Sequence, residues 1–248
     1  MKIAILGYGK MGREIERLAK SRNMEVASII DRSDPSATSN SITNESVQNA
    51  DVAIDFTHPD TVLENIKLVS GFGKNMVVGT TGWYKHLDEV KAIVKRNGTG
   101  FIYSPNFSIG VSLFLRIVEE ASRLFDKVED YDVFVYEGHH NQKADSPSGT
   151  AKAIADTILK NMKRKKKLVS DKLERKILPE ELHVASFRAG YIPGTHVVGF
   201  DSEADTIELK HTARNRSGFA LGALLAAEWI KVRKGFFTMD DFLSDFFK

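Results

Sequence analysis

The chain has 248 residues, of which 42% are hydrophobic and 27% are charged, which is typical of a folded globular protein and argues against disorder. It carries 35 basic and 33 acidic residues, so the formal net charge of +2 gives no reason to expect nucleic acid as a partner. The sequence contains no cysteine, which excludes disulfides, thiolate metal ligands and cysteine nucleophiles.

Short apolar runs alternate with amphipathic stretches over the first part of the chain. The apolar runs predict strands over residues 3–6, 25–30, 51–56, 76–78 and 101–103. Residues with helical spacing predict helices over 10–21, 60–70 and 86–96. Strands that alternate with helices indicate βαβ units, so we expect an α/β fold with a Rossmann-like, doubly wound parallel sheet.

The pattern changes after residue 106. It predicts helices over 108–125, 151–162 and 217–232, and strands over 131–137, 183–188, 196–200 and 206–211. The last three strands follow one another without a helix, which indicates a second α+β domain with a mixed, largely antiparallel sheet. The aromatic-rich, amphipathic segment 236–247 is expected to pack back on the first domain. The predicted domains are therefore 1–106 together with 215–248, and 107–214.

A glycine-rich loop follows the first predicted strand. Residues 7–12, Gly-Tyr-Gly-Lys-Met-Gly, fit the pattern G-x-G-x-x-G between a strand and a helix, where the glycines allow a tight turn and let a pyrophosphate approach the backbone. The N–H groups and the dipole of the helix start attract phosphate. Asp31, 19 residues after Gly12, stands where a carboxylate can bind the adenosine ribose, and Arg32 can face a 2′-phosphate. The motif predicts a dinucleotide site; the alternative is a glycine turn that binds nothing.

A second cluster, Glu137–Ala151, runs from the end of a predicted strand to the start of a predicted helix. His139, His140 and Lys143 place two imidazoles and one ammonium within five residues, and such groups transfer protons near neutral pH or bind anions. Residues 148–150, Ser-Gly-Thr, add hydroxyls and backbone N–H groups that suit a carboxylate or phosphate. These residue types predict a site for an anionic substrate.

A purely structural interpretation of the same segment stays open on spacing alone. Residues 147–150 can be a turn and a helix N-cap, and the two histidines can be surface residues. A metal site is disfavoured, because adjacent histidines are poorly placed to chelate together and the sequence has neither an H-E-x-x-H motif nor a cysteine.

Four segments of the chain resemble the 4-hydroxy-tetrahydrodipicolinate reductase (dihydrodipicolinate reductase) family. They are residues 7–12, 79–82, 104–111 and 137–151, the last of which matches every fixed position of the family signature E-x-H-H-x-x-K-x-D-x-P-S-G-T-A. The resemblance runs almost end to end, through Gly194-Thr195-His196 and the helix around residues 219–220. It implies an NAD(P)H-dependent oxidoreductase that converts 4-hydroxy-tetrahydrodipicolinate to tetrahydrodipicolinate, with loss of water, in diaminopimelate and lysine biosynthesis.

The resemblance also implies roles for individual residues. His139 would be a catalytic proton donor or acceptor, and Lys143 a catalytic proton donor. The substrate-binding residues would be His140, Ser148, Gly149 and Thr150. The cofactor-binding residues would be Gly7, Tyr8, Gly9, Lys10, Met11, Gly12, Asp31, Arg32, Gly79, Thr80, Thr81, Ser104, Pro105, Asn106 and Phe107.

Cofactor and partners follow from the same resemblance. Residues 1–106 and 215–248 would bind the dinucleotide, NADH or NADPH, and 107–214 would bind a small dicarboxylate substrate and form a homotetramer. The phosphate loop is shorter than in many relatives and the segment after Asp31 is short, so the sequence leaves both cofactors open. We expect no metal and no nucleic acid. We also expect no membrane partner, because no apolar run approaches the roughly 18–20 residues of a membrane span. A cytoplasmic location is the expectation that follows. The N-terminal apolar run, residues 3–6, is too short for a signal peptide.

Two other classes of protein compete with this interpretation. A dinucleotide-sensing regulator would keep the glycine loop but would need neither the histidines nor the lysine of 137–151, and it would usually carry a DNA-reading helical module, of which the sequence gives no sign. Another two-domain oxidoreductase is disfavoured by the 137–151 signature. The basic run 163–167 is interpreted as a solvated helix end or mobile loop, because acidic residues follow it. Trp83 is open to packing or cofactor contact, and no role is assigned to His58, His86, His183, His196 or His211.

Overall fold

The computed structural model describes residues 1–246, and the chain divides into two compact units. Unit 1 comprises residues 1–109 and 216–248, and unit 2 comprises residues 110–215. The last residue of the predicted aromatic-rich segment, Phe247, lies outside the described residues. Among the residues that are described, no helix is both long enough and apolar enough to span a membrane.

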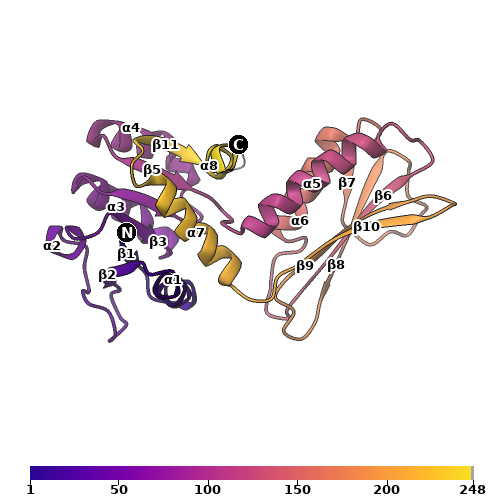
Figure 1. Cartoon of the computed structure of the whole chain (residues 1–248). Coiled ribbons are helices and arrows are strands. Elements are labelled where there is room, and N and C mark those ends of the chain that lie inside the picture. The colour runs from indigo at the N-terminus through magenta and orange to yellow at the C-terminus, as the bar shows by residue number, and fades with distance from the viewer. Residues whose placement is uncertain (247–248) are drawn as a thin grey trace. The chain divides into compact units, whose positions relative to one another are not determined.

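Unit 1 is built on a six-stranded sheet in which every pair of neighbours is parallel (Figure 1). Its strands are β1 (Lys2–Leu6), β2 (Glu25–Ile30), β3 (Val52–Asp55), β4 (Asn75–Val78), β5 (Gly100–Tyr103) and β11 (Gly235–Thr238), in the order β11-β5-β4-β3-β1-β2. Its helices are α1 (Lys10–Ser21), α2 (Asn44–Val47), α3 (Pro59–Gly71), the 3₁₀ turn η1 (Tyr84–His86), α4 (Leu87–Asn97), α7 (Ser217–Ile230) and α8 (Met239–Phe246).

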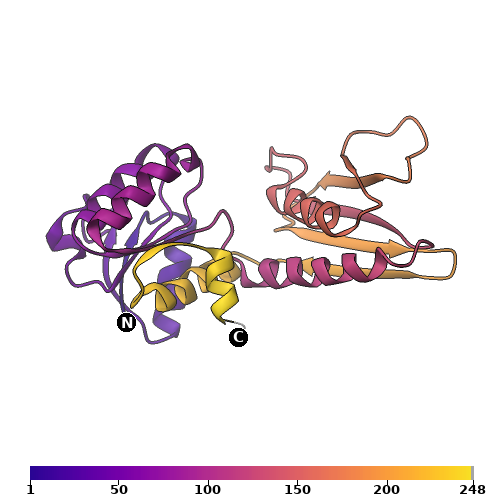
Figure 2. The ribbon, with the colours of Figure 1, turned by 90° about the horizontal axis from the view of Figure 1, so that it is seen from above.

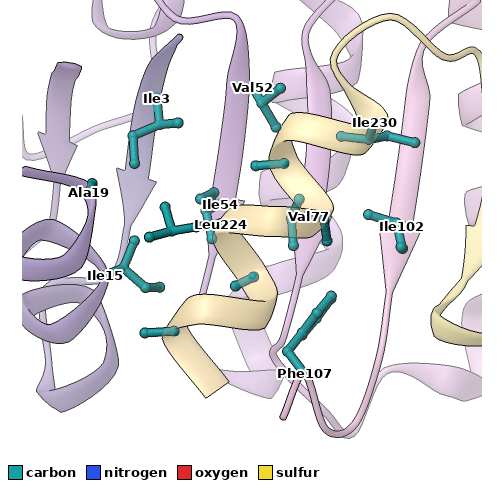
Figure 3. Packing of buried hydrophobic residues seen from close by; sticks show 14 of the residues in the cluster. Ile3, Ile15, Ala19, Val52, Ile54, Val77, Ile102, Phe107, Leu224 and Ile230 are labelled. Carbon is teal, nitrogen blue, oxygen red and sulfur yellow. The ribbon is translucent and has the colours of Figure 1, made fainter. Parts of the chain in front are cut away.

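Helices cover both faces of this sheet. Because side chains alternate along each strand, one strand contributes residues to a core on each face. Ile3 and Ile5 of β1 belong to a core shared with α1, α7 and α8, whereas Ala4 and Leu6 belong to a second core shared with α2, α3 and α4. Figure 3 shows Leu224 of α7 over the strands that carry Ile54 and Val77. The predicted Rossmann-like, doubly wound parallel sheet is confirmed.

Unit 2 combines two long helices with a five-stranded sheet. Its elements are α5 (Ile109–Phe125), β6 (Asp132–His139), α6 (Gly149–Asn161), β7 (Lys167–Val169), β8 (Glu181–Arg188), β9 (Thr195–Asp201) and β10 (Thr206–Thr212). In the order β10-β9-β6-β8-β7, the first two pairings are antiparallel and the last two are parallel. The predicted mixed sheet is confirmed, but it is more parallel than expected, because the crossover through α6 returns the chain parallel to β6.

Both helices of unit 2 cover one face of its sheet (Figure 2). Val133 and Val135 of β6 are buried against Phe114 of α5 and Ile154 of α6. Phe134, which points to the opposite face, is only half-buried. The same alternation places residues 137 and 139 on the helix-covered face as β6 ends.

The C-terminal segment contains a strand that the sequence pattern did not reveal. Gly235–Thr238 forms β11 and pairs with β5, and the ring of Phe236 stacks on Phe101 with centroids 5.2 Å apart. The short elements α2 and β7 were not predicted either. The expectation that this segment packs back on the first domain is correct, since Phe242 and Leu243 of α8 lie in the core of unit 1.

The basic run 163–167 is less exposed than predicted. The side chain of Lys165 is 1% exposed, and its ammonium donates at 2.8 Å to the carbonyl oxygens of Pro179 and Glu181 and pairs with Asp132 at 2.6 Å. These partners compensate for burying the charge. Lys165 therefore fixes the segment before β8 inside unit 2 rather than reaching into solvent.

Candidate active site

The glycine loop joins the carboxyl end of β1 to α1. Gly7 has φ +85°, which favours glycine, and a side chain there would overlap the backbone of Phe56. A Cβ on Gly12 would overlap the carbonyl oxygen of Gly7. A Cβ on Gly9 would meet no atom within 4 Å, so the space beside this N-cap residue of α1 is open. An open backbone cradle at a helix start fits a phosphate group.

A cavity of about 440 Å³ lies beside this loop. It is formed at the carboxyl ends of β1, β2 and β3, where the strand order reverses and where open α/β sheets bind ligands. Four residues predicted to bind cofactor line it: Gly7, Gly9, Asp31 and Arg32. Other polar residues of its lining had no predicted role, namely Asn40, Ser41, Thr57, His58, Thr61, Glu64 and Asn65.

The carboxylate of Asp31 is largely engaged by its own surroundings. Oδ2 accepts a hydrogen bond from the N–H of Tyr8 at 2.7 Å, and Oδ1 accepts from the N–H of Ser33 at 2.9 Å, its hydroxyl at 3.2 Å and the N–H of Asp34 at 3.0 Å. The bonds from Tyr8 and Ser33 hold the pKa of Asp31 below its ordinary value. Asp31 thus ties the glycine loop to the loop after β2, and only Oδ2 retains room for a further donor such as a ribose hydroxyl.

Asp55, fully buried at the end of β3, organises the neighbouring strand ends. Oδ1 accepts from the hydroxyls of Thr57 at 2.8 Å and Thr80 at 2.7 Å, and Oδ2 accepts from the amide of Asn65 at 2.8 Å. Burial raises the pKa of Asp55, and these donors oppose the rise. Because Thr57 and Asn65 line the cavity, its wall on this side depends on Asp55.

The remaining predicted cofactor residues follow β4 and β5, at the same edge of the sheet. Gly79, Thr80 and Thr81 come directly after β4, and residues 104–107 come directly after β5. Ser104 and Asn106 form a turn in which the hydroxyl of Ser104 donates to the carbonyl oxygen of Asn106 at 2.7 Å. The predicted cofactor residues that are exposed are Gly9, Lys10, Arg32, Thr81 and Pro105.

Besides Ser104, which is 5% exposed, four of the predicted cofactor residues have side chains that pack inward. Phe107 is 1% exposed in the core, edge-on to Phe56, and Thr80 is 6% exposed and bonded to Asp55. Tyr8 is 7% exposed, and Met11 packs against the core. Their side chains contribute to the packing of unit 1, and their contact with the cofactor stays a prediction. Trp83 also packs inward at 1% exposure, where its indole N–H donates to the carbonyl of Thr80.

In unit 2, one buried carboxylate lies where β6, β8 and α6 meet. Oε2 of Glu137, which is 0% exposed, is hydrogen-bonded to Nδ1 of His139. Oε1 accepts from Nη2 of Arg188 at 2.9 Å and from the N–H of Ser148 at 3.3 Å. Glu137 therefore connects the predicted proton-transfer residue to the start of the predicted anion-binding helix.

The two partners influence each other's ionisation. Burial raises the pKa of Glu137, but hydrogen bonds and the charges of His139 and Arg188 outweigh it, so the pKa lies below its ordinary value. Burial lowers the pKa of His139, and the neighbouring carboxylate offsets only part of this effect. At neutral pH the pair is thus a carboxylate and a neutral imidazole. Because a carboxylate only accepts hydrogen bonds, Nδ1 of His139 carries the hydrogen.

His196 of β9 lies next to His139, with ring centroids 5.2 Å apart. Its Nε2 is 3.2 Å from the hydroxyl of Ser148, which caps α6 by accepting from the N–H of Ala151. Burial lowers the pKa of His196 to about 4, so the ring is neutral at neutral pH. No role was predicted for His196, although the segment Gly194-Thr195-His196 belongs to the resemblance.

The loop between β6 and α6 carries Lys143, whose ammonium pairs with Asp145 at 2.7 Å. Nη2 of Arg188 also donates to the carbonyl oxygen of Asp145 at 2.6 Å, which ties this loop to Glu137. His140 is half-buried, as is Thr150. Gly149 is exposed and a Cβ there would meet no atom within 4 Å, so the start of α6 is open to a ligand.

Glu137, His139 and His196 offer ligand atoms within 4.8 Å of one another, as a metal site requires. However, Glu137 already pairs with the Arg188 guanidinium and with Nδ1 of His139. A cation would have to displace both and lie beside a fixed positive charge. The donor set therefore favours a carboxylate–imidazole pair over a metal centre.

Comparison with known proteins assigns the chain to a family. The family described as dihydrodipicolinate reductase, N-terminus, matches residues 1–107, and its counterpart, dihydrodipicolinate reductase, C-terminus, matches residues 110–243. The chain belongs to the dihydrodipicolinate reductase family. Residues 1–107 accordingly belong to a Rossmann-like dinucleotide-binding domain.

Individual relatives support the family assignment. A 4-hydroxy-tetrahydrodipicolinate reductase of Christiangramia forsetii is 39% identical over 250 residues, and the match covers 100% of this chain and 100% of that protein. One from Methanoregula boonei is 37% identical, over 98% of this chain and 97% of its own. The solved structure of a dipicolinate-bound dihydrodipicolinate reductase from Paenisporosarcina sp. TG-14 has a TM-score of 0.77 at 25% identity, covering 96% of this chain and 97% of that one. The predicted family and the predicted activity, an NAD(P)H-dependent reductase of diaminopimelate and lysine biosynthesis, are confirmed.

The structure of this dihydrodipicolinate reductase adds two residues to the site to which the sequence alone assigned no role. Glu137 is a fixed position of the signature but had no predicted role. Arg188 comes to the site through strand register, since β6 and β8 pair residue 139 with residue 188. No motif in the sequence indicated that pairing.

Proposed function

Within this activity, we propose that the dinucleotide binds at the cavity of unit 1 and that the dicarboxylate substrate binds at the end of β6 in unit 2. The observation that carries the substrate site is the bridge made by Glu137. Its carboxylate joins His139 to Ser148, so a proton-transfer group and an open helix start belong to one site.

The glycine loop is proposed to hold the pyrophosphate, with Gly9 giving it room and the start of α1 supplying N–H groups. NAD(P)H, when bound, supplies the hydride that reduces the unsaturated ring formed from the hydroxy substrate by loss of water. Residues 79–81 and 104–106, at the ends of β4 and β5, are proposed to line the nicotinamide side.

The substrate residues are proposed to act electrostatically. One carboxylate of the substrate would bind at residues 148–150, where the hydroxyl of Ser148 and the helix start favour an anion. His140 would hold the ring, and Lys143 would exchange its pairing with Asp145 for the substrate. The ammonium of Lys143 and the imidazole of His139 then stabilise the negative charge that develops on the ring and supply its proton. A dianionic ligand also raises the pKa of a nearby imidazole, which favours proton uptake by His139 as the substrate binds.

A coupled assay tests this assignment. Aspartate semialdehyde and pyruvate are condensed by the preceding synthase, and oxidation of NADH or NADPH is followed by absorbance. We expect turnover by the wild type and a kcat lower by about 10²-fold or more in His139→Asn, with NAD(P)H binding retained. Full turnover in His139→Asn would refute the assignment of the substrate site.

We propose that both NADH and NADPH are used, since Asp31 has little free acceptor capacity and the exposed Arg32 lines the cavity. Asp31→Ala is expected to weaken both cofactors, because it releases the N–H of Tyr8 in the glycine loop. Arg32→Ala is expected to weaken NADPH alone. Fluorescence titration with each cofactor measures this, and loss of NADH only in Asp31→Ala would instead support a direct ribose bond.

We propose that the protein is a cytoplasmic homotetramer assembled through the sheet of unit 2. The face of this sheet opposite the helices carries the stacked rings of Phe134 and Tyr136 and the 48% exposed Phe187. Exposed aromatic surface of this kind marks association. Light scattering gives the mass, and Phe187→Glu is expected to lower it; an unchanged tetramer would exclude this face.

A further inference from the structure

We infer that Glu137 is a positioning residue for the reaction. Its buried carboxylate, paired with Arg188, accepts a hydrogen bond from the Nδ1–H of His139 and leaves Nε2 as the nitrogen that exchanges a proton with the substrate. The inference rests on the proposed role of His139 and adds the group that sets the tautomer and direction of its ring.

Geometry is the first support. Glu137 and His139 lie on the same face of β6, two residues apart, so their side chains meet inside unit 2. Nε2 then faces the turn before β9, where a Cβ on Gly194 would come within 3.0 Å of it. Gly194 has φ +145°, which favours glycine, and so no side chain stands there. The carboxylate thus holds one ring nitrogen while the other faces a position without a side chain.

The energetic cost of the arrangement is the second support. Removing a carboxylate from water is unfavourable, and an apolar residue of similar size would pack as well without that cost. Arg188, whose side chain is 18% exposed, compensates for the charge of Glu137. Arg188 also holds the carbonyl of Asp145, whose carboxylate pairs with Lys143. The Glu137–Arg188 pair therefore orders the surroundings of both predicted proton-transfer residues.

The charged residues around His139 shift its pKa in opposite directions, and these shifts can be measured. Glu137 on β6 raises the pKa of His139, whereas Lys143 on the loop before α6 and Arg188 on β8 lower it. His196 on β9 also faces the ring, and His211 on β10 lies behind His196 with centroids 6.4 Å apart.

The test is the pH dependence of kcat/KM in the coupled assay. The pKa belonging to His139 is the one that disappears in His139→Asn. We expect Glu137→Gln to move it to lower pH and to reduce kcat by about 10²-fold while KM for NAD(P)H stays unchanged, because an orienting carboxylate acts through the imidazole. Arg188→Gln is expected to move the same pKa to higher pH.

A matched control separates positioning from loss of a buried ion pair. Glu181, 2% exposed, is held by Arg175 at 2.7 Å elsewhere in unit 2, so Glu181→Gln removes a comparable pair without touching His139. Glu181→Gln should leave the pKa of His139 unchanged. Glu137→Asp should restore part of the pH profile that Glu137→Gln loses. Shifts in the same direction for Glu137→Gln and Arg188→Gln, no shift in either, or an equal shift in Glu181→Gln would overturn the inference.

A spectroscopic measurement needs no substitution at Glu137 and therefore does not depend on the folding of that variant. In the wild type labelled with ¹⁵N-histidine, the signal of His139 is identified by its loss in His139→Asn. We expect the Nδ1–H tautomer above the pKa; the Nε2–H tautomer would overturn the inference. An impaired His139→Asn beside a normal Glu137→Gln would refute this inference alone, whereas an active His139→Asn would refute the proposed function.

Discussion

Asn75 holds the C-terminal return of the chain against the central sheet, and its removal should destabilise unit 1. The side chain is 3% exposed at the start of β4. Its Nδ2 carries two hydrogens, which are shared among the carbonyl oxygens of Ile230 at 2.8 Å, Lys231 at 3.0 Å and Arg233 at 3.2 Å. Its Oδ1 accepts from the buried N–H of Gly100 at 2.7 Å. One amide therefore links β4, β5 and the segment between α7 and β11.

The expected loss in Asn75→Ala follows from these bonds. A buried N–H left without an acceptor costs about 1–3 kcal/mol, and two bonds from Nδ2 contribute about 1 kcal/mol each. The sum is about 3–5 kcal/mol, a large part of the roughly 5–15 kcal/mol by which domains are stable. Asn97→Ala is the matched control, since Asn97 makes a single bond to the hydroxyl of Ser70 and should lose about 1 kcal/mol.

Urea unfolding followed by tryptophan fluorescence measures this loss in unit 1 alone. The chain has two tryptophans, Trp83 and Trp229, and both lie in unit 1. We expect a lower midpoint with an unchanged slope. A loss no larger than that of Asn97→Ala would refute the reasoning.

Three further outcomes are expected. His139→Ala and Lys143→Ala should each lower kcat by about 10²-fold or more while NAD(P)H still binds, and full turnover in both would contradict their roles. Gly12→Ala places a methyl group on a backbone oxygen of the glycine loop and should abolish dinucleotide binding in fluorescence titration, whereas Gly71→Ala, where the methyl group meets no atom within 4 Å, should bind normally. The pKa of His196 is lowered to about 4, so its contribution to stability is complete above about pH 6.5 and is lost as the pH falls toward 4. The stability difference between wild type and His196→Gln should therefore shrink over that range in urea titrations, and a constant difference would contradict the buried neutral ring.

Local patterns in the sequence predicted most of the fold that positions the site. The side chains of the run Ile3–Leu6 point alternately into two cores. The loop after this strand requires glycine at positions 7 and 12, because a Cβ at either position would overlap backbone atoms. These constraints act between residues close in sequence, and periodicity or a motif reveals them. The segment 137–151 is likewise contiguous, so its resemblance to the reductase signature depends on no contact between distant parts of the chain.

Other features depended on which segments meet. The strand β11 has four residues in an aromatic-rich stretch, and only its pairing with β5, more than 130 residues earlier, makes it a strand. Helix capping and strand alternation give no information about such partners.

The sequence by itself determined the fold class and the reductase family, and it predicted His139 and Lys143 as the proton-transfer residues. Only the tertiary structure decided that Phe107 packs inward, that Lys165 is buried, and that Arg188 meets Glu137 across 51 positions of the chain. The physical reason is that burial and ion pairing depend on which strands become neighbours. Register between distant strands is fixed by the packing of the whole sheet rather than by any local run of residues.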